Sequence, residues 1–74
     1  MLTDRSITFG AFNDRGVRHE LVAVKPADEP WQLIDIATTT RGERVTTEVE
    51  RFAAYETSDA VRAVADDILR HHPD

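Results

Sequence analysis

The chain has 74 residues, a formal net charge of −5 and no cysteine. This length predicts one small domain spanning residues 1–74, because typical domains have at least about 50 residues and usually more. The lack of cysteine excludes disulfides, zinc-thiolate sites and thiol nucleophiles. Hydrophobic residues make up 41% and charged residues 31% of the chain, which is typical of folded domains and not of disordered ones.

The sequence carries no signal of a membrane segment. No apolar run approaches the roughly 18 residues that a membrane span requires, and the first five residues lack the basic and apolar regions of a signal peptide. We therefore expect a cytoplasmic protein that spans no membrane. The net negative charge also disfavours a groove that follows a phosphate backbone, so nucleic acid is not the expected partner.

Apolar alternation and turn residues predict four strands, at about residues 6–12, 17–25, 31–39 and 44–52. Asn13–Gly16 and Thr40–Gly42 have the composition of short hairpin loops that end on a glycine. Two prolines in the segment 26–30 end the second strand and predict a rigid connection.

Residues 58–70 are expected to form a helix, because Ser58 and Asp59 are typical of a helix start and apolar residues follow at helical spacing. The predicted fold is therefore α+β: a four-stranded antiparallel β-meander (ββββα) with one C-terminal helix packed on one sheet face. No motif identifies a protein family.

Three-residue loops in both hairpins would place apolar residues opposite one another across each pair of strands. The sheet face that results, here called the first face, is expected to lie under the helix. Its predicted members are Ile7, Phe9, Leu21, Ala23, Trp31, Leu33, Val45 and Val49.

The opposite face of the sheet, here called the second face, also carries apolar residues. Val22, Val24, Ile34 and Ile36 form its predicted centre, and Phe12 and Phe52 are expected to extend its rim. One helix cannot cover both faces, so this patch predicts an interface with a second copy or another protein. Alternatively, strand twist, the stem of Arg18 or the proline-containing loop could shield the patch within the monomer.

Few residues suggest chemistry. The segment His71–Asp74 holds two imidazoles and a carboxylate, but adjacent helical residues diverge, so we expect solvated side chains and no metal site. His19 is expected to lie on the first face near its edge, as a partly buried, hydrogen-bonded residue and not as a catalytic base. Asp35 should face the helix side opposite Thr47, where a hydroxyl or an arginine would satisfy its carboxylate. We predict no catalytic residue and no cofactor.

The leading functional hypothesis is a non-catalytic protein-interaction or regulatory module that forms a homodimer through the second face. One alternative is a nucleic-acid-associated accessory protein, and another is an acidic inhibitor of a nucleic-acid-binding partner. The first alternative would use arginines near the loops, namely Arg5, Arg15, Arg18, Arg41 and Arg44.

Overall fold

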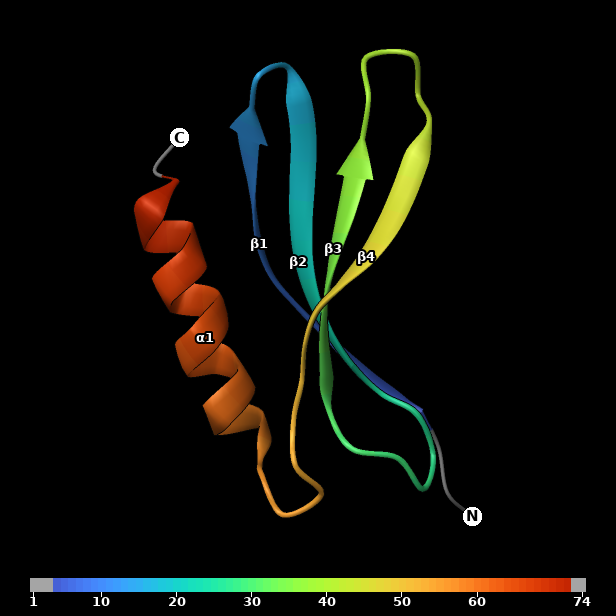
Figure 1. The fold of residues 1–74 in the computed structure, drawn as a ribbon, viewed down its shortest axis with the longest axis vertical. Helices are drawn as coiled ribbons and strands as arrows, with labels where there is room; N and C mark the ends of the chain where they lie inside the picture. The colour runs from blue at the N-terminus through green and yellow to red at the C-terminus, as the bar shows by residue number, and fades with distance from the viewer. Residues whose placement is uncertain (1–3, 73–74) are drawn as a thin grey trace.

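The computed structural model describes residues 4–72 as one antiparallel sheet and one helix (Figure 1). The strands are neighbours in the order β1-β2-β3-β4, and the helix follows them in the chain. The predicted α+β meander with a C-terminal helix is therefore confirmed. The elements are β1 (Arg5–Asp14), β2 (Val17–Lys25), β3 (Gln32–Thr38), β4 (Arg44–Arg51) and α1 (Ser58–His71).

The two hairpins have different turns. Asp14 pairs with Val17, which leaves a two-residue turn of Arg15 and Gly16, with φ angles of 54° and 82°. Two positive φ angles are typical of the type I′ turn, whose twist matches that of the flanking strands. The three-residue loop expected in the first hairpin is therefore wrong.

The second hairpin has the predicted three-residue loop. The backbone N–H of Thr39 donates to the carbonyl oxygen of Glu43 at 2.9 Å, and these two residues enclose Thr40–Gly42. The last residue of this loop, Gly42, has a φ of 86°. The loop thus ends on a residue type that adopts this conformation without steric cost.

A β-bulge in β1 changes which residues face the helix. Ile7 pairs with Ala23 as expected, but the register then shifts, so that Phe9 and Gly10 both lie opposite Leu21. Beyond a bulge of this kind the side-chain alternation is reversed. Phe12 consequently points to the first face, where it is only 7% exposed and belongs to the core.

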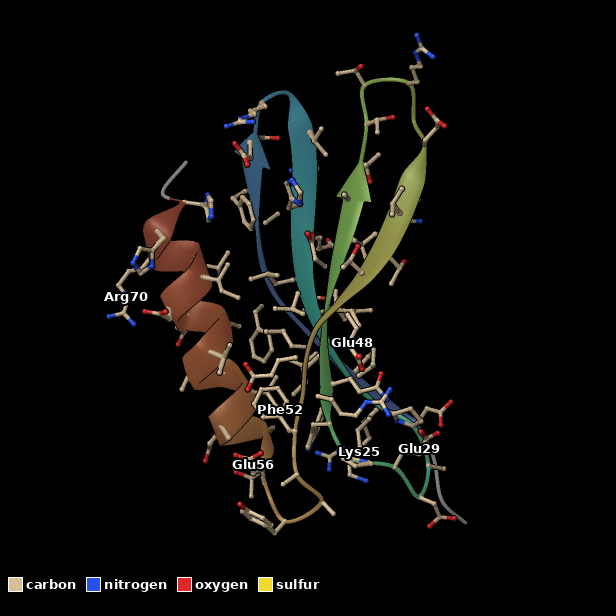
Figure 2. The ribbon with its side chains drawn as sticks, viewed as in Figure 1. Lys25, Glu29, Glu48, Phe52, Glu56 and Arg70 are labelled. Carbon is tan, nitrogen blue, oxygen red and sulfur yellow. The ribbon has the colours of Figure 1, made fainter. Side chains whose placement is uncertain are left out.

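A second bulge does the same in β4. Val49 and Glu50 together lie opposite Leu33, and the N–H of Phe52 then donates to the carbonyl oxygen of Trp31 at 3.0 Å. Phe52 is 5% exposed and points between α1 and the strands (Figure 2). The expected position of Phe12 and Phe52 on the rim of the second face is therefore wrong, because each follows a bulge that reverses its direction.

The core lies between the first face and α1. Val61 and Ala65 of the helix are completely buried, and the helix contacts β1, β2 and β3. The buried core residues are Phe12, Leu21, Ala23, Trp31, Leu33, Phe52, Val61 and Ala65. On the opposite side of the helix, Arg70 points away from the sheet (Figure 2).

The helix does not cover the whole first face. Within residues 4–72, no Cα atom of α1 lies within 8 Å of a Cα atom of β4, where Val45 and Val49 are 56% and 41% exposed. A helix is about 10 Å wide and strands lie about 4.8 Å apart, so one helix cannot cover all four strands. The expectation that α1 covers the entire first face is therefore wrong for β4.

Candidate interaction surfaces

The second face has an apolar centre on its two middle strands. Val22 pairs with Ile34 across β2 and β3, and Val24 and Ile36 point to the same side. Val22 is 8% exposed, whereas the other three side chains are half-buried. The structure thus brings together the four residues that were predicted to form this patch.

No second layer lies over this patch in the part of the chain that the structure describes. The only helix of residues 4–72 packs on the first face, and all four strands belong to one sheet. The partial burial of the patch therefore comes mainly from neighbouring side chains on the twisted sheet. An uncovered apolar area at the centre of a sheet is typical of an interaction surface.

The patch is bordered by charges of both signs. The register places Glu20 beside Ile36 and Glu48 beside Ile34. The arginines on the same face lie towards its ends and on β4. They are Arg18, Arg44 and Arg51, and the Nε of Arg51 donates to the Oε1 of Glu48 at 3.0 Å.

On the first face, His19 and Asp35 form a polar contact near the end of the core. The Nδ1 of His19 lies 2.9 Å and 3.1 Å from the two carboxylate oxygens of Asp35. Both side chains are about one-fifth exposed, at 21% and 22%. His19 is thus partly buried and hydrogen-bonded, as predicted, whereas the expected hydroxyl or arginine partner of Asp35 is wrong.

Aromatic stacking connects this pair to the end of the helix. The ring of Phe12 lies 4.9 Å from that of His19 and 4.3 Å from that of His72, and both pairs are nearly parallel. His72 caps the helix, where its N–H donates to the carbonyl oxygen of Leu69. The stack therefore holds the C-terminal end of α1 against β1 and β2.

The His19–Asp35 pair resembles one part of a catalytic site, because a carboxylate often orients a histidine base. Such a base also needs a nucleophile or a substrate proton within hydrogen-bond reach. Among residues 4–72, no hydrogen bond connects His19 to a hydroxyl group. The arrangement supplies an orienting contact without the remaining parts of a nucleophilic site.

Residues 4–72 hold no group of three or more His, Asp or Glu side chains that could bind a metal ion. The two adjacent histidines diverge, since His72 stacks on Phe12 while the Nδ1 of His71 lies 2.7 Å from the carbonyl oxygen of Asp67. Pro73 and Asp74, which complete the segment considered in the sequence, lie outside the described residues.

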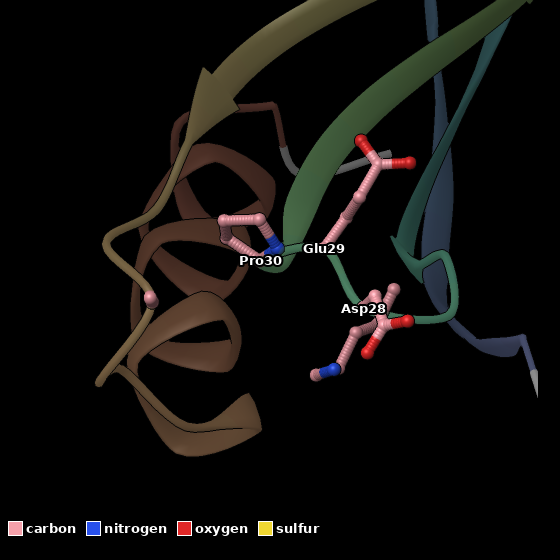
Figure 3. A pocket seen from close by; sticks show the side chains of 5 residues that line it. Asp28, Glu29 and Pro30 are labelled. Carbon is pink, nitrogen blue, oxygen red and sulfur yellow. The ribbon is translucent and has the colours of Figure 1, made fainter. Parts of the chain in front are cut away.

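A shallow pocket of about 200 Å³ lies where the β2–β3 loop approaches the segment after β4 (Figure 3). Its charged residues include Lys25, Asp28 and Glu29, and Pro30 and Ala54 complete the lining. It is open to solvent and combines both charge signs. These features do not define a particular class of ligand.

The arginines proposed for nucleic-acid contact fall into two groups. Arg15 and Arg41 lie in the two hairpin turns, and Arg18 and Arg44 are both paired with Thr38 on the strands beside them. All four are exposed and lie at one end of the sheet. Arg5 lies elsewhere, with its guanidinium 5.4 Å from the centre of the Trp31 ring.

The contact between His19 and Asp35 was not predicted from the sequence. Their contact depends on the β2–β3 register, in which Leu21 lies opposite Asp35 and His19 lies opposite Ala37. The hairpin loops predict only the registers of β1 with β2 and of β3 with β4. A register for the central pair, with the apolar residues of β2 and β3 facing one another, would have placed these two first-face side chains close together.

Comparisons of the chain with protein-family models, with curated proteins and with solved structures found no match. Within the described residues, no helix has the length and apolar character needed to cross a membrane.

Proposed function

We propose that this chain is a non-catalytic protein-interaction module that forms a homodimer through the second face. The observation that carries this proposal is the uncovered apolar centre formed by Val22, Val24, Ile34 and Ile36. Val22 is already largely buried, so the gain comes from removing the exposed parts of Val24, Ile34 and Ile36 from water. This favourable free energy does not depend on a specific hydrogen-bond geometry.

The border of the patch supports pairing with an identical surface. A two-fold axis brings the same patch of both copies together, so each charged side chain meets the border of the other copy. Glu20 and Glu48 supply negative charge, and Arg18, Arg44 and Arg51 supply positive charge. A border with both signs can form ion pairs between copies around a dry centre.

The architecture of the described residues supports the same proposal. They form one sheet layer and one helix, so the domain is thin. Small domains often gain stability by association.

Light scattering over a concentration series tests the proposal with the double variant Val22→Glu plus Ile34→Glu. We expect the solution mass of this variant to be half that of the wild type, with the far-ultraviolet circular dichroism unchanged. Tyr55→Glu plus Ala63→Glu is the matched control, because both of these residues are exposed and lie outside the sheet. A wild-type monomer, or a folded double variant with unchanged mass, would overturn the homodimer.

A second candidate function is nucleic-acid association through the arginines at the hairpin end. The clustering of Arg15, Arg18, Arg41 and Arg44 favours it, although the chain is acidic overall. Binding to single-stranded or duplex DNA should then weaken steeply as salt is raised, because the arginines displace counterions. Arg18→Ala plus Arg44→Ala should reduce both the affinity and the salt slope, and the absence of binding at low salt would exclude this function.

The non-catalytic assignment has its own test. Asp35 is the best placed carboxylate for orienting a histidine base, through its contact with His19. A broad substrate screen that found turnover, and lost it in Asp35→Asn, would contradict the proposal.

A further inference from the structure

The strand β4 is an open edge of the sheet. It pairs with β3 on one side, and no element of the described residues lies on its other side (Figure 1). All eight of its residues are exposed. An edge strand presents unpaired N–H and C=O groups, which can pair with another chain unless the strand is blocked.

The hydrogen bond that closes the β3–β4 loop shows which backbone groups of β4 are unpaired. The N–H of Thr39 donates to the carbonyl oxygen of Glu43, so these residues form a hydrogen-bonded pair. In an antiparallel ladder such pairs alternate with pairs that have no hydrogen bonds between them. The N–H and C=O groups of Val45 and Thr47 therefore point to β3.

The N–H and C=O groups of the alternate residues point outward. These residues are Arg44, Thr46 and Glu48, and they have a regular pairing with β3 that ends at the bulge of Val49 and Glu50. The segment Arg44–Glu48 contains no proline, and its two charged residues, Arg44 and Glu48, have opposite signs, so its charges do not repel a second copy of the same segment as a single-sign edge would. The open edge is thus a regular five-residue segment.

We propose that β4 of one copy pairs with β4 of a second copy in an antiparallel ladder, with the two-fold axis at Thr46. In this register Thr46 lies opposite Thr46 of the second copy, and Arg44 lies opposite Glu48 of the second copy. Arg44, Thr46 and Glu48, whose backbone N–H and C=O groups point outward, then each lie opposite a residue of the second copy whose backbone groups also point outward. The backbones can form three hydrogen-bonded pairs, and the four sheet strands of each copy become one continuous sheet of eight.

The side chains favour the same register. Arg44 and Glu48 both lie on the second face. Arg44 of each copy therefore lies beside Glu48 of the other copy, and both pairs have opposite charges. An axis at Glu48 would instead place two carboxylates opposite each other. An axis at Val45 would place Arg44 opposite Thr46 and would form no ion pair.

The opposite edge of the sheet is less suited to this pairing. The bulge at Phe9 and Gly10 interrupts β1 in the middle of the strand. The helix also lies against β1, with Arg62 over the Phe9 ring and Leu69 next to Gly10. The charge pattern of β4 complements itself, so a second copy of this chain is the occupant that fits the edge.

A cysteine scan tests the register, because the chain has no other cysteine. In Thr46→Cys the two Cα atoms would lie about 5.5 Å apart, within the range for a disulfide. In Thr47→Cys they would be offset by two residues and about 8 Å apart, which is too far. We expect mild oxidation to cross-link Thr46→Cys into a dimer and to leave Thr47→Cys as a single chain; cross-linking of Thr47→Cys but not Thr46→Cys would overturn the register.

A second test uses backbone substitution. The N–H of Thr46 points away from β3, so Thr46→Pro removes a donor from the proposed interface and none from the sheet. Thr46→Val is the matched control, since it keeps the N–H. We expect the solution mass of Thr46→Pro to be half that of Thr46→Val and of the wild type. Equal masses for the folded variants would overturn the pairing.

Charge reversal provides a further variant should Thr46→Pro not fold. Arg44→Glu alone would place like charges opposite each other at two positions and reduce association by about tenfold. Arg44→Glu plus Glu48→Arg should restore association, because the exchanged charges pair again. No restoration in the double variant would contradict the Arg44–Glu48 pairing.

These outcomes are separate from those of the second-face dimer. If only the edge pairs, the wild type contains two chains, and Thr46→Pro contains one while Val22→Glu plus Ile34→Glu still contains two. If only the second face associates, the responses of the two variants are reversed. If both surfaces associate, each variant halves the mass and the combination of both produces a monomer.

Discussion

The imidazole of His19 and the carboxylate of Asp35 lie 2.9 Å apart on the first face, on neighbouring strands. Both are less than one-quarter exposed, so neither group is fully hydrated. Loss of one partner would leave the other polar group partly buried with fewer hydrogen bonds. The contact therefore contributes to the choice of the β2–β3 register as well as to stability.

A double-mutant cycle measures this contact. His19→Ala and Asp35→Ala should each lower the free energy of unfolding by about 1–2 kcal/mol, because a hydrogen-bond partner of a partly buried group is lost. The double variant should lose less than the sum, with a coupling of about 1 kcal/mol in urea denaturation. Additivity within about 0.3 kcal/mol would show that the contact does not stabilise the fold.

Phe12 provides a test of the first bulge. Its ring is 7% exposed and stacks on His19 and His72, so Phe12→Ala should lower the free energy of unfolding by about 3–5 kcal/mol. Tyr55→Ala is the control, since Tyr55 is 87% exposed and should change stability by less than about 0.5 kcal/mol. Similar small effects for both variants would place Phe12 outside the core.

The close approach of Gly10 to Leu69 predicts a steric effect. A Cβ atom at Gly10 would lie 3.0 Å from a terminal methyl carbon of Leu69, so Gly10→Val should crowd the contact between β1 and α1. Overpacking of this kind costs about 1–3 kcal/mol in thermal or urea unfolding. Gly10→Val should lower the free energy of unfolding by less when Leu69→Ala is also present. An equal loss in both backgrounds would mean that residues 10 and 69 do not contact each other.

The sequence was sufficient to predict the order of the elements, because apolar alternation and glycine-containing loops define each hairpin. It was not sufficient to predict the facing of Phe12 and Phe52, since each depends on a bulge that alternation alone does not reveal. A signal was nevertheless present. Phe9 and Phe12 are three residues apart, as are Val49 and Phe52, so one regular strand cannot place both members of a pair on the same face.

The incomplete covering of the first face by α1 could not be predicted for a different reason. Hairpin register correctly predicted that Val45 lies on the first face, opposite Ala37, whereas Val49 belongs to the bulge opposite Leu33. How far the helix covers these two valines depends on where it lies across the sheet. The apolar stripe of α1 shows which side of the helix is buried without showing which strands it contacts. The position of the helix near β1 leaves β4 open, and it is this position that makes the edge available to a second copy.

The turn between β1 and β2 offers a stabilising substitution. Arg15 has a φ of 54°, a conformation that costs most residues with a Cβ atom about 1–2 kcal/mol and that asparagine tolerates better. Asn-Gly is also the preferred sequence of a type I′ turn. Arg15→Asn should therefore raise the free energy of unfolding by about 0.5–1 kcal/mol, as measured by urea denaturation.

The control for this prediction is Arg41→Asn in the other hairpin. Arg41 is also an exposed loop arginine, but its φ is not among the positive values found in the described residues. The two substitutions remove the same charge, so a difference between them reports the backbone conformation and not electrostatics. If both substitutions raise the free energy of unfolding equally, the stabilisation comes from reduced repulsion among the arginines at the hairpin end. If Arg15→Asn does not raise it, Arg15 adopts its turn conformation without strain.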